Sequence, residues 1–239
     1  MSQAQLTNTE IADARWRNLY RLGGIASITV LIIMLISVVG YIAWPNAAGV
    51  TPTLKIFNLI QTNIWAAFIA LDLGLSVGNL VAIFIYLALY VALRRVDETF
   101  ALIALVLGLV AIAALIAARP LFEIFTLSNL YMAASTETTK ALYLAAGETL
   151  LVQFHGAAWY TYMFLGTVAS LIYAVLMLRS QSFSRVLAYV GIVTFTINAF
   201  FWVPVVGLML LFVAMFSSVL WYILLARDLF RLAKRSVAK

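Results

Sequence analysis

The chain has 239 residues, of which 65% are hydrophobic and 10% are charged, and its mean hydropathy is +1.07. This balance excludes an ordinary soluble domain and is typical of a protein embedded in a lipid bilayer. The formal net charge is +6, with one histidine and no cysteine. That count excludes disulfides, thiolate metal sites, zinc sites of three histidines and bis-histidine haem ligation within one chain.

Long apolar runs predict the membrane-spanning elements, because a helix needs about 20 apolar residues to cross a hydrocarbon core of about 30 Å. Run length and the first charge at each end mark six helical spans: residues 22–44, 65–93, 99–118 with a helical continuation to 134, 150–178, 186–203 and 206–226. The fold class expected is therefore all-α, a polytopic six-transmembrane-helix bundle that forms one integral membrane domain over residues 1–239.

The segments between and before the spans also carry helix signals. Residues 1–20 are too polar for a cleaved signal peptide and are expected to form a cytoplasmic amphipathic lead-in helix, which begins with a capping box at Thr7–Glu10. A short helix is expected after Pro52, and another at residues 141–146. The last two spans are separated only by the region of Pro204, so they should form an antiparallel pair.

Lysine and arginine predict the orientation, since short loops rich in these residues stay in the cytoplasm. Most of them lie on one side of the predicted membrane, at residues 15–21, 94–95, 179–185 and 227–239. Only Lys55, Arg119 and Lys140 lie on the other side. Both termini should be cytoplasmic, and the protein should sit in the plasma (inner) membrane. The positive charge then indicates contact with membrane lipids and not with nucleic acid.

Polar residues at membrane depth are the candidates for function, because ionisable groups there are costly and face a partner, a cavity or the bundle interior. Counting 1.5 Å per residue from the cytoplasmic helix ends places three such residues near the external boundary and others close by or deeper. The candidate ligand-binding residues are His155, Asp72, Arg119, Glu123, Asn79, Trp159 and Asn198. No catalytic residue, metal ligand or cofactor is expected, because no catalytic or phosphate-binding motif occurs.

Two interpretations of the outer polar layer stay open. In the functional one, Arg119 pairs with Asp72 or Glu123 in an externally open cavity, where His155 supplies a titratable or hydrogen-bonding group. In the structural one, Arg119 and Glu123 form an i, i+4 pair at headgroup level, Asp72 reaches toward the headgroups, and His155 and Trp159 belong to the interfacial belt. Asn79 and Asn198 could line a polar path or simply bond neighbouring helices.

Short motifs in this chain resemble one known family. They are YRLGGI at 20–25, ALDLGL at 70–75, FHG at 154–156, FLG at 164–166 and LRSQSFSRVLAYVG at 178–191. The set resembles the domain-of-unknown-function 4386 (DUF4386) family of bacterial multi-pass membrane proteins, over nearly the whole chain. The family pattern has proline at the position of Ser184 and an acidic residue at the position of Asn79. The resemblance implies a multi-pass membrane protein and no particular activity.

The leading hypothesis is a membrane protein without enzymatic activity that binds a lipid or another amphipathic small molecule through an externally facing polar cavity, or that serves as an accessory subunit. The expected partners are membrane lipids, a small amphipathic ligand, and a second copy or a partner membrane subunit. One alternative is a small transporter or proton-coupled carrier that uses Asp72, Arg119 and His155. Another is an intramembrane enzyme that uses His155 with a carboxylate as acid and base.

Overall fold

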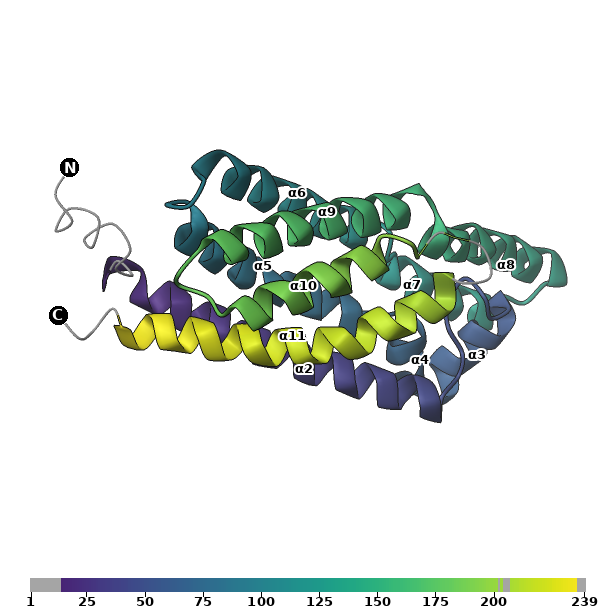
Figure 1. Ribbon diagram of the computed structural model, residues 1–239. Helices are drawn as coiled ribbons and strands as arrows, with labels where there is room; N and C mark the ends of the chain where they lie inside the picture. Colours follow the sequence, from purple (N-terminus) through teal and green to yellow (C-terminus); the bar gives the residue numbers. More distant parts are fainter. Residues whose placement is uncertain (1–13, 202, 204–206, 236–239) are drawn as a thin grey trace, which may run out of the picture. The chain divides into compact units, whose positions relative to one another are not determined.

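The computed structural model describes residues 14–201, 203 and 207–235, and all regular elements in these ranges are helices (Figure 1). They are η1 (Ala14–Trp16), α2 (Arg17–Ala43), α3 (Thr53–Thr62), α4 (Ile64–Ala70), α5 (Leu73–Leu93), α6 (Glu98–Ala117), α7 (Leu121–Ala133), α8 (Glu137–Val152), η2 (Gln153–His155), α9 (Ala157–Arg179), α10 (Arg185–Asn198) and α11 (Gly207–Arg235). The predicted capping box at Thr7–Glu10, most of the lead-in helix and the turn at Pro204 lie outside the described residues.

Five helices within the described ranges are long and apolar enough to cross a membrane: Arg17–Ala43, Leu73–Leu93, Glu98–Ala133, Glu137–Arg179 and Val213–Arg235. The protein is therefore an all-α, multi-pass membrane protein. The predicted fifth span, residues 186–203, differs from the structure, because α10 ends at Asn198. With 14 residues, α10 is about 21 Å long and shorter than a hydrocarbon core of about 30 Å. The described helices therefore do not confirm the predicted six full membrane spans.

Several helix limits also differ from the predicted ones. The predicted first span begins at Leu22, whereas α2 begins at Arg17. A basic side chain in the first turn of a membrane helix can extend to the headgroups, so the helix can start before the apolar run does. The predicted second span, 65–93, is divided at Leu71 and Asp72, and the fourth, 150–178, is divided at Gly156. The third continues to Ala133 as predicted, with an interruption before α7.

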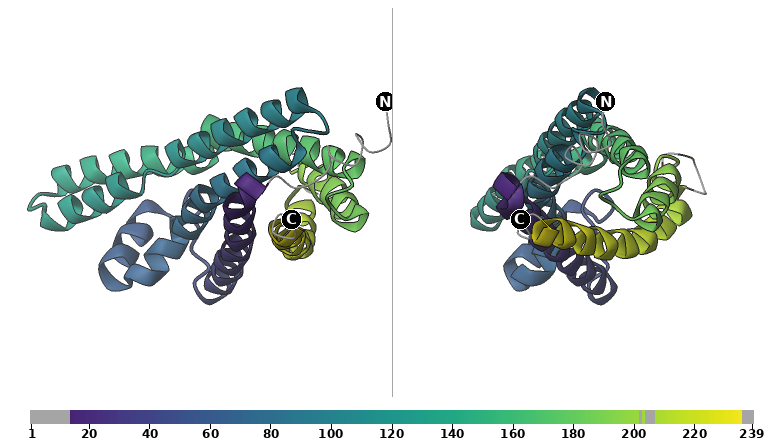
Figure 2. Two further views of the ribbon diagram at one scale, coloured as in Figure 1. Left: turned by 90° about the vertical axis from the view of Figure 1, so that its left-hand side faces the viewer. Right: turned by 60° about the vertical axis from the view of Figure 1, so that its left-hand side comes forward.

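Contacts divide the chain into two compact units, whose described residues fall within 1–31, 80–111 and 163–239 for unit 1, and within 32–79 and 112–162 for unit 2. In unit 1, Tyr173 is buried among α5, α6 and α9, and its hydroxyl lies 3.2 Å from the carbonyl oxygen of Tyr86 and 3.3 Å from that of Ala101. A buried hydroxyl placed this way keeps its donor satisfied. α10 and α11 pack along each other in opposite directions, as the sequence predicts (Figures 1 and 2).

In unit 2, helices α3, α4, α7 and α8 pack together, and we call these four helices the cap (Figures 1 and 2). Their contact is apolar at the centre, where Ile56, Phe57 and Ile60 are buried on one face of α3 with Ile124 of α7. The i, i+1, i+4 spacing puts these side chains on one stripe of the helix. Ser128 fixes the pairing, since its hydroxyl donates to the Phe57 carbonyl at 3.1 Å.

The cap includes both short helices that were expected outside the spans. α3 follows Pro52, which precedes its first turn, a position where proline costs no hydrogen bond. α8 contains residues 141–146 and is capped by Thr136, whose side chain accepts a hydrogen bond from the Thr139 backbone N–H. The two longest apolar stretches, 98–133 and 137–179, would measure about 54 and 65 Å as continuous helices. They therefore exceed what a bilayer of about 30 Å requires.

Candidate functional site

Three helix interruptions lie in unit 2. α4 and α5 are separated at Asp72, which has a φ of +57°, a left-handed conformation that aspartate tolerates better than most residues. α6 and α7 are separated by Arg119 and Pro120, where proline removes a backbone donor. α8 and α9 are separated by η2 and Gly156. Each interruption leaves carbonyl groups without a partner in their own helix.

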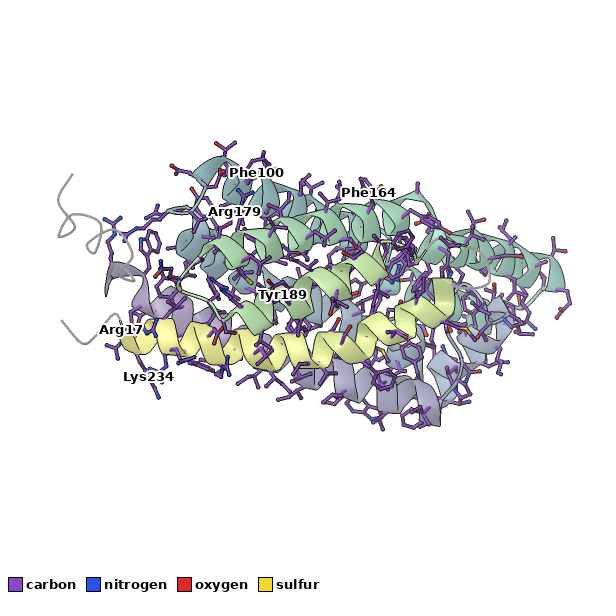
Figure 3. All side chains as sticks on the ribbon, viewed as in Figure 1. Arg17, Phe100, Phe164, Arg179, Tyr189 and Lys234 are labelled. Atoms are coloured by element: carbon purple, nitrogen blue, oxygen red, sulfur yellow. The ribbon has the colours of Figure 1, made fainter. Side chains whose placement is uncertain are left out.

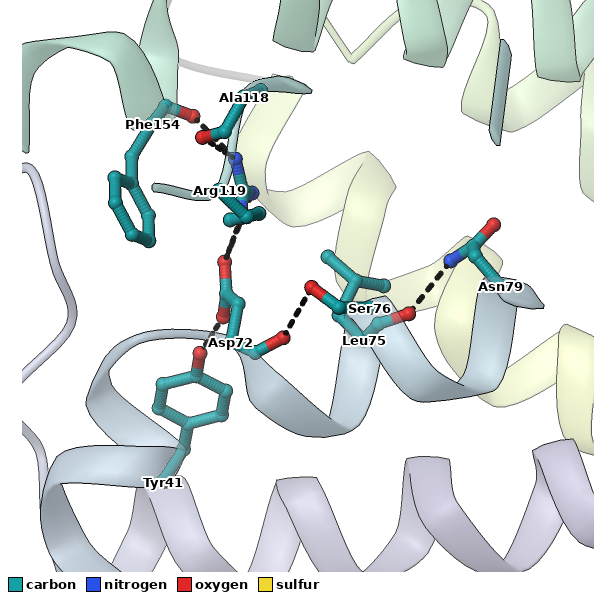
Figure 4. A network of polar contacts seen from close by, with 8 residues as sticks. All are labelled: Tyr41, Asp72, Leu75, Ser76, Asn79, Ala118, Arg119 and Phe154. Atoms are coloured by element: carbon teal, nitrogen blue, oxygen red, sulfur yellow. Dashed lines mark hydrogen bonds and ion pairs between the residues drawn. The ribbon is translucent and has the colours of Figure 1, made fainter. Parts of the chain in front are cut away.

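A single arginine connects these interruptions (Figure 4). The Arg119 Nε and Nη2 atoms both lie 2.9 Å from Asp72 Oδ2. The Arg119 side chain is 2% exposed and that of Asp72 is 19% exposed, so the pair is largely removed from solvent. The other Asp72 oxygen accepts a hydrogen bond from the Tyr41 hydroxyl of α2. Pairing of this kind is what allows a charge to be buried at all.

The remaining donors of Arg119 serve the backbone at the interruptions. Its Nη1 donates to the carbonyl oxygen of Ala118 at 3.2 Å and to that of Phe154 at 3.1 Å. The guanidinium carbon lies 4.7 Å from the Phe154 ring centre and 4.6 Å from that of Trp159, within the range of a cation–π contact. We call Tyr41, Asp72, Arg119, Phe154 and Trp159 the Arg119 cluster. It joins all three helix interruptions.

This geometry decides between the two interpretations of Arg119. Its partner is Asp72, so the alternative of an i, i+4 pair with Glu123 is wrong. Pro120 interrupts the helix between the two residues, and Glu123 is exposed in the first turn of α7. The expectation that Asp72 reaches toward headgroups is also wrong, because both of its oxygens are held inside the cluster.

His155 lies at the edge of the cluster. It is exposed, and its ring meets that of Trp159 edge to face, with centres 6.4 Å apart. Within the described residues it forms no ion pair with Asp72 or Glu123, the two carboxylates expected beside it. Gly49, with a φ of +79°, packs against the ring, since an added Cβ would lie 2.5 Å from His155 Nδ1. His155 is thus positioned by contacts on two sides while its remaining surface stays open.

The two deeper asparagines form unrelated hydrogen bonds, one within a helix and one between helices. Asn79 is half-buried, and its Nδ2 donates to the Leu75 carbonyl of its own helix at 3.0 Å. Asn198 belongs to unit 1, where its Nδ2 donates to Thr167 Oγ1 at 2.8 Å and so joins α10 to α9. Hydrogen bonding of a membrane helix to its neighbour is sufficient to explain Asn198.

Sequence reasoning missed three polar contributions. Tyr41 looks like an interfacial aromatic residue at the end of an apolar run, and Phe154 contributes through its carbonyl, which every residue has. Asp228 of α11 is only 2% exposed, and its Oδ2 accepts a hydrogen bond from the Ser184 backbone N–H at 2.8 Å in unit 1. One signal was available for Asp228, which is the only acidic residue after Glu148. Among the residues that the structure describes, no group of three histidine or acidic side chains could hold a metal ion.

Comparison with known protein families identifies the chain. The family model described as a domain of unknown function, DUF4386, matches residues 25–227. The chain belongs to the DUF4386 family. The DUF4386 match extends from within α2 into α11 and includes every member of the Arg119 cluster, so the resemblance seen in the sequence motifs is confirmed. Comparisons with curated proteins and with solved structures find no match.

Proposed function

We propose that this chain forms one integral domain of the plasma membrane with both termini in the cytoplasm and the cap outside. The distribution of basic residues supports this orientation. So do the helix lengths: Asp72 is about 32 Å along the chain from Leu93, and Arg119 about 30 Å from Thr99, at 1.5 Å per residue. In unit 1, Arg17, Arg179 and Lys234 lie toward the same end (Figure 3). Three segments thus carry basic residues at one end of unit 1 (Figure 3).

Single introduced cysteines test this orientation, because the natural chain contains none. Cysteine at Ser2, Gln181 or Ala238 is expected to be protected from a membrane-impermeant thiol reagent in intact cells. Cysteine at Asn46 or Thr138 is expected to react. Permeabilised cells provide the control, since all five positions should then be labelled. Labelling of Ser2→Cys or Ala238→Cys from outside intact cells would reverse the orientation.

The proposed activity is binding of a lipid or another amphipathic small molecule to the outer face of the cap, without catalysis. The observation that carries it is the exposed segment from Val152 to His155. Val152 is 66% exposed, and Gln153 and His155 are also exposed, whereas Phe154 between them is buried. This segment presents an apolar side chain beside two polar ones, which matches a molecule with an acyl chain and a polar headgroup.

The Arg119 cluster contacts the segment from Val152 to His155 through Phe154, the buried residue of that segment. Because the Phe154 carbonyl accepts a hydrogen bond from Arg119 and the Phe154 ring covers its guanidinium, the backbone of the segment is fixed before any ligand arrives. Preorganisation of this kind lowers the entropic cost of binding. The cluster therefore serves as a scaffold in this proposal, and the ligand faces Trp159 of the cluster and His155 at its edge.

Other apolar side chains of the cap agree with an amphipathic ligand. Phe122 of α7 is 86% exposed, and Leu142 of α8 is also exposed. Both lie beyond the Arg119 cluster along their helices, where the hydrocarbon core of about 30 Å has already been crossed. Large apolar groups exposed there favour contact with lipid, an amphipathic molecule or a partner protein. A partner membrane subunit or a second copy of the chain would occupy the same surface.

Photocrosslinking tests the proposal. The purified chain in mild detergent is incubated with a phospholipid that carries a diazirine on its acyl chain, and crosslinked residues are mapped by mass spectrometry. Crosslinks are expected around residues 150–160, and Val152→Ser should weaken lipid binding about tenfold, the effect of losing most of one buried valine. Phe164→Ser, at an exposed position within α9, is the matched control and should retain binding. Equal losses in both variants, or no crosslinks around residues 150–160, would contradict a site there.

A carrier remains the second candidate because interrupted helices are characteristic of transporters. It requires the Asp72–Arg119 pair to open during transport. Proton leakage through liposomes that contain the chain, abolished by Asp72→Asn, would favour a proton-coupled carrier.

A non-enzymatic role is supported by the geometry of the only histidine, which has no carboxylate partner among the described residues, while Asp72 is already engaged by Arg119 and Tyr41.

A further inference from the structure

The loop between α2 and α3, residues 44–52, folds onto the cap, and we call it the cap loop. Its Ala48 N–H donates to the carbonyl oxygen of Ala70 at 2.9 Å. Ala70 is the last residue of α4, so the loop supplies a partner for a helix end that needs one. The Thr51 N–H donates to the Ala47 carbonyl at 3.0 Å, and Ala48 is only 4% exposed. These contacts fix the backbone of the cap loop.

Gly49 brings the cap loop against His155. Its φ is +79°, a conformation that glycine adopts at little cost. A Cβ added to Gly49 would lie 2.5 Å from His155 Nδ1, 3.0 Å from His155 Cε1 and 3.1 Å from the Leu151 carbonyl oxygen. A side chain at position 49 would therefore displace the imidazole, because the Leu151 backbone leaves no room on its other side.

This contact also decides which part of the imidazole a ligand can reach. Nδ1 and Cε1 are the ring atoms closest to Gly49, so Nε2 is the nitrogen farther from the cap loop. The Trp159 ring meets the imidazole edge to face, with centres 6.4 Å apart, and His155 is nevertheless exposed. A hydrogen bond from His155 to a ligand would therefore use Nε2.

Two exposed valines lie close to this imidazole in the chain. Val50 directly follows Gly49 and is 78% exposed, and Val152 directly follows Leu151 and is 66% exposed. Because Gly49 approaches the Leu151 carbonyl, the two valines belong to segments that touch each other. Large apolar side chains exposed together indicate a contact surface.

We propose that Gly49 positions His155 for ligand binding, and that Val50 joins Val152 in contacting the acyl chain of a ligand whose headgroup bonds His155 Nε2. The inference rests on the proposed binding of an amphipathic molecule, and it adds the cap loop to that site. An imidazole fixed between Gly49 and Trp159 loses little freedom when a ligand arrives, so the empty position 49 favours binding.

The positioning of His155 can be measured without a ligand, because it is the only histidine of the chain. Histidine labelled with ¹³C and ¹⁵N gives one imidazole spin system in NMR spectra of the full chain in mild detergent. The neighbouring Trp159 ring shifts these signals according to its position. Gly49→Ala should therefore change the imidazole chemical shifts, since the added Cβ moves the ring relative to Trp159.

Two further glycine variants separate this effect from backbone strain. Gly49→Asn carries the same Cβ, but asparagine tolerates positive φ better than alanine does, so it should change the imidazole shifts with a smaller loss of thermal stability. Gly78→Ala is the control, because its added Cβ would lie 3.7 Å from the nearest atom, Cγ2 of Ile33. It should leave the imidazole shifts unchanged.

Binding of the diazirine phospholipid tests the ligand contacts. Val50→Ser should weaken binding about tenfold, as expected for most of one buried valine. Gly49→Ala should weaken it about fivefold, the value of one hydrogen bond to the ligand. In a His155→Ala background, Gly49→Ala should cause no further loss, because no imidazole remains to be displaced. Phe164→Ser again serves as the exposed control.

The outcomes distinguish this inference from the proposed function. No binding by the wild type would contradict the proposed function. Wild-type binding together with unchanged imidazole shifts in both Gly49 variants, or with full binding by Val50→Ser, would overturn the inference and leave a site at residues 150–160. Equal losses from Gly49→Ala with and without His155 would overturn it as well, since the glycine would then act only on the loop backbone.

Discussion

Replacement of Arg119 by leucine is expected to lower the free energy of unfolding by about 3–5 kcal/mol, the cost of removing one member of a buried ion pair. Asp72 would keep a charge inside unit 2 with only the Tyr41 hydroxyl as a donor, and the Ala118 and Phe154 carbonyls would lose the donor they share. Denaturation in mild detergent, followed by helical circular dichroism, measures the loss.

Two further variants show whether this loss comes from the pair. Lys140→Leu is the surface control, because Lys140 pairs with Glu137 at 3.0 Å in an exposed part of α8, and exposed pairs contribute little to stability. Arg119→Lys keeps the charge but not the planar group that bonds Asp72 and two carbonyls at once, so its stability should fall between those of the wild type and Arg119→Leu. If Arg119→Leu were no less stable than Lys140→Leu, the pair would not stabilise the fold.

Replacement of Asp228 by alanine is expected to lower the free energy of unfolding by about 2 kcal/mol, the contribution of a hydrogen bond to a charged group. Asp228 accepts from the Ser184 backbone N–H at the start of α10 and pairs with Arg227 at 3.2 Å. Its loss would leave that N–H without a partner and remove one hydrogen bond between the start of α10 and α11. The arginine would lose less, because its side chain is half exposed and can be hydrated.

Comparison with Asp228→Asn separates the two contributions. Asparagine retains an oxygen for the Ser184 N–H but carries no charge, so its loss should be smaller than that of alanine. Arg231→Gln is the control, since Arg231 approaches Asp228 only to 3.7 Å and is largely exposed. Equal stability of the alanine variant and the wild type, measured by the same denaturation, would show that Asp228 does not hold α10 to α11.

The sequence predicts most of the helical framework because apolar run length and flanking charges are set by the bilayer itself. Pairing of Asp72 with Arg119 is one of two predicted options, and depth alone suggests it, since helix rise places the two residues at similar distances from the cytoplasmic ends of their helices. Depth alone does not exclude Glu123 as the partner of Arg119. Its exclusion depends on Pro120, which interrupts the helix between the two residues instead of only bending it.

Three other features of the structure, at Asp72, Asn198 and Phe154, leave no comparable signal in the sequence. The interruption at Asp72 occurs within a predominantly apolar stretch without proline, where composition predicts a continuous helix. The end of α10 at Asn198 is hidden because the residues up to Val203 are also apolar. The Phe154 carbonyl could not be identified from residue types at all. Each of these residues forms a hydrogen bond with a residue far away in the sequence: Asp72 with Arg119, Asn198 with Thr167, and Phe154 with Arg119.

The Arg119 cluster also has a consequence for biosynthesis. Its members enter the membrane in the order Tyr41, Asp72, Arg119, Phe154 and Trp159, since the ribosome makes the chain from the N-terminus. When Arg119 emerges, Asp72 and Tyr41 are already available, whereas the second carbonyl and both aromatic rings are not. The arginine is fully satisfied only once the segment through Trp159 has joined the others. A nascent chain halted after α7 therefore carries an incompletely paired guanidinium, a feature by which cellular quality control could distinguish it from the finished protein.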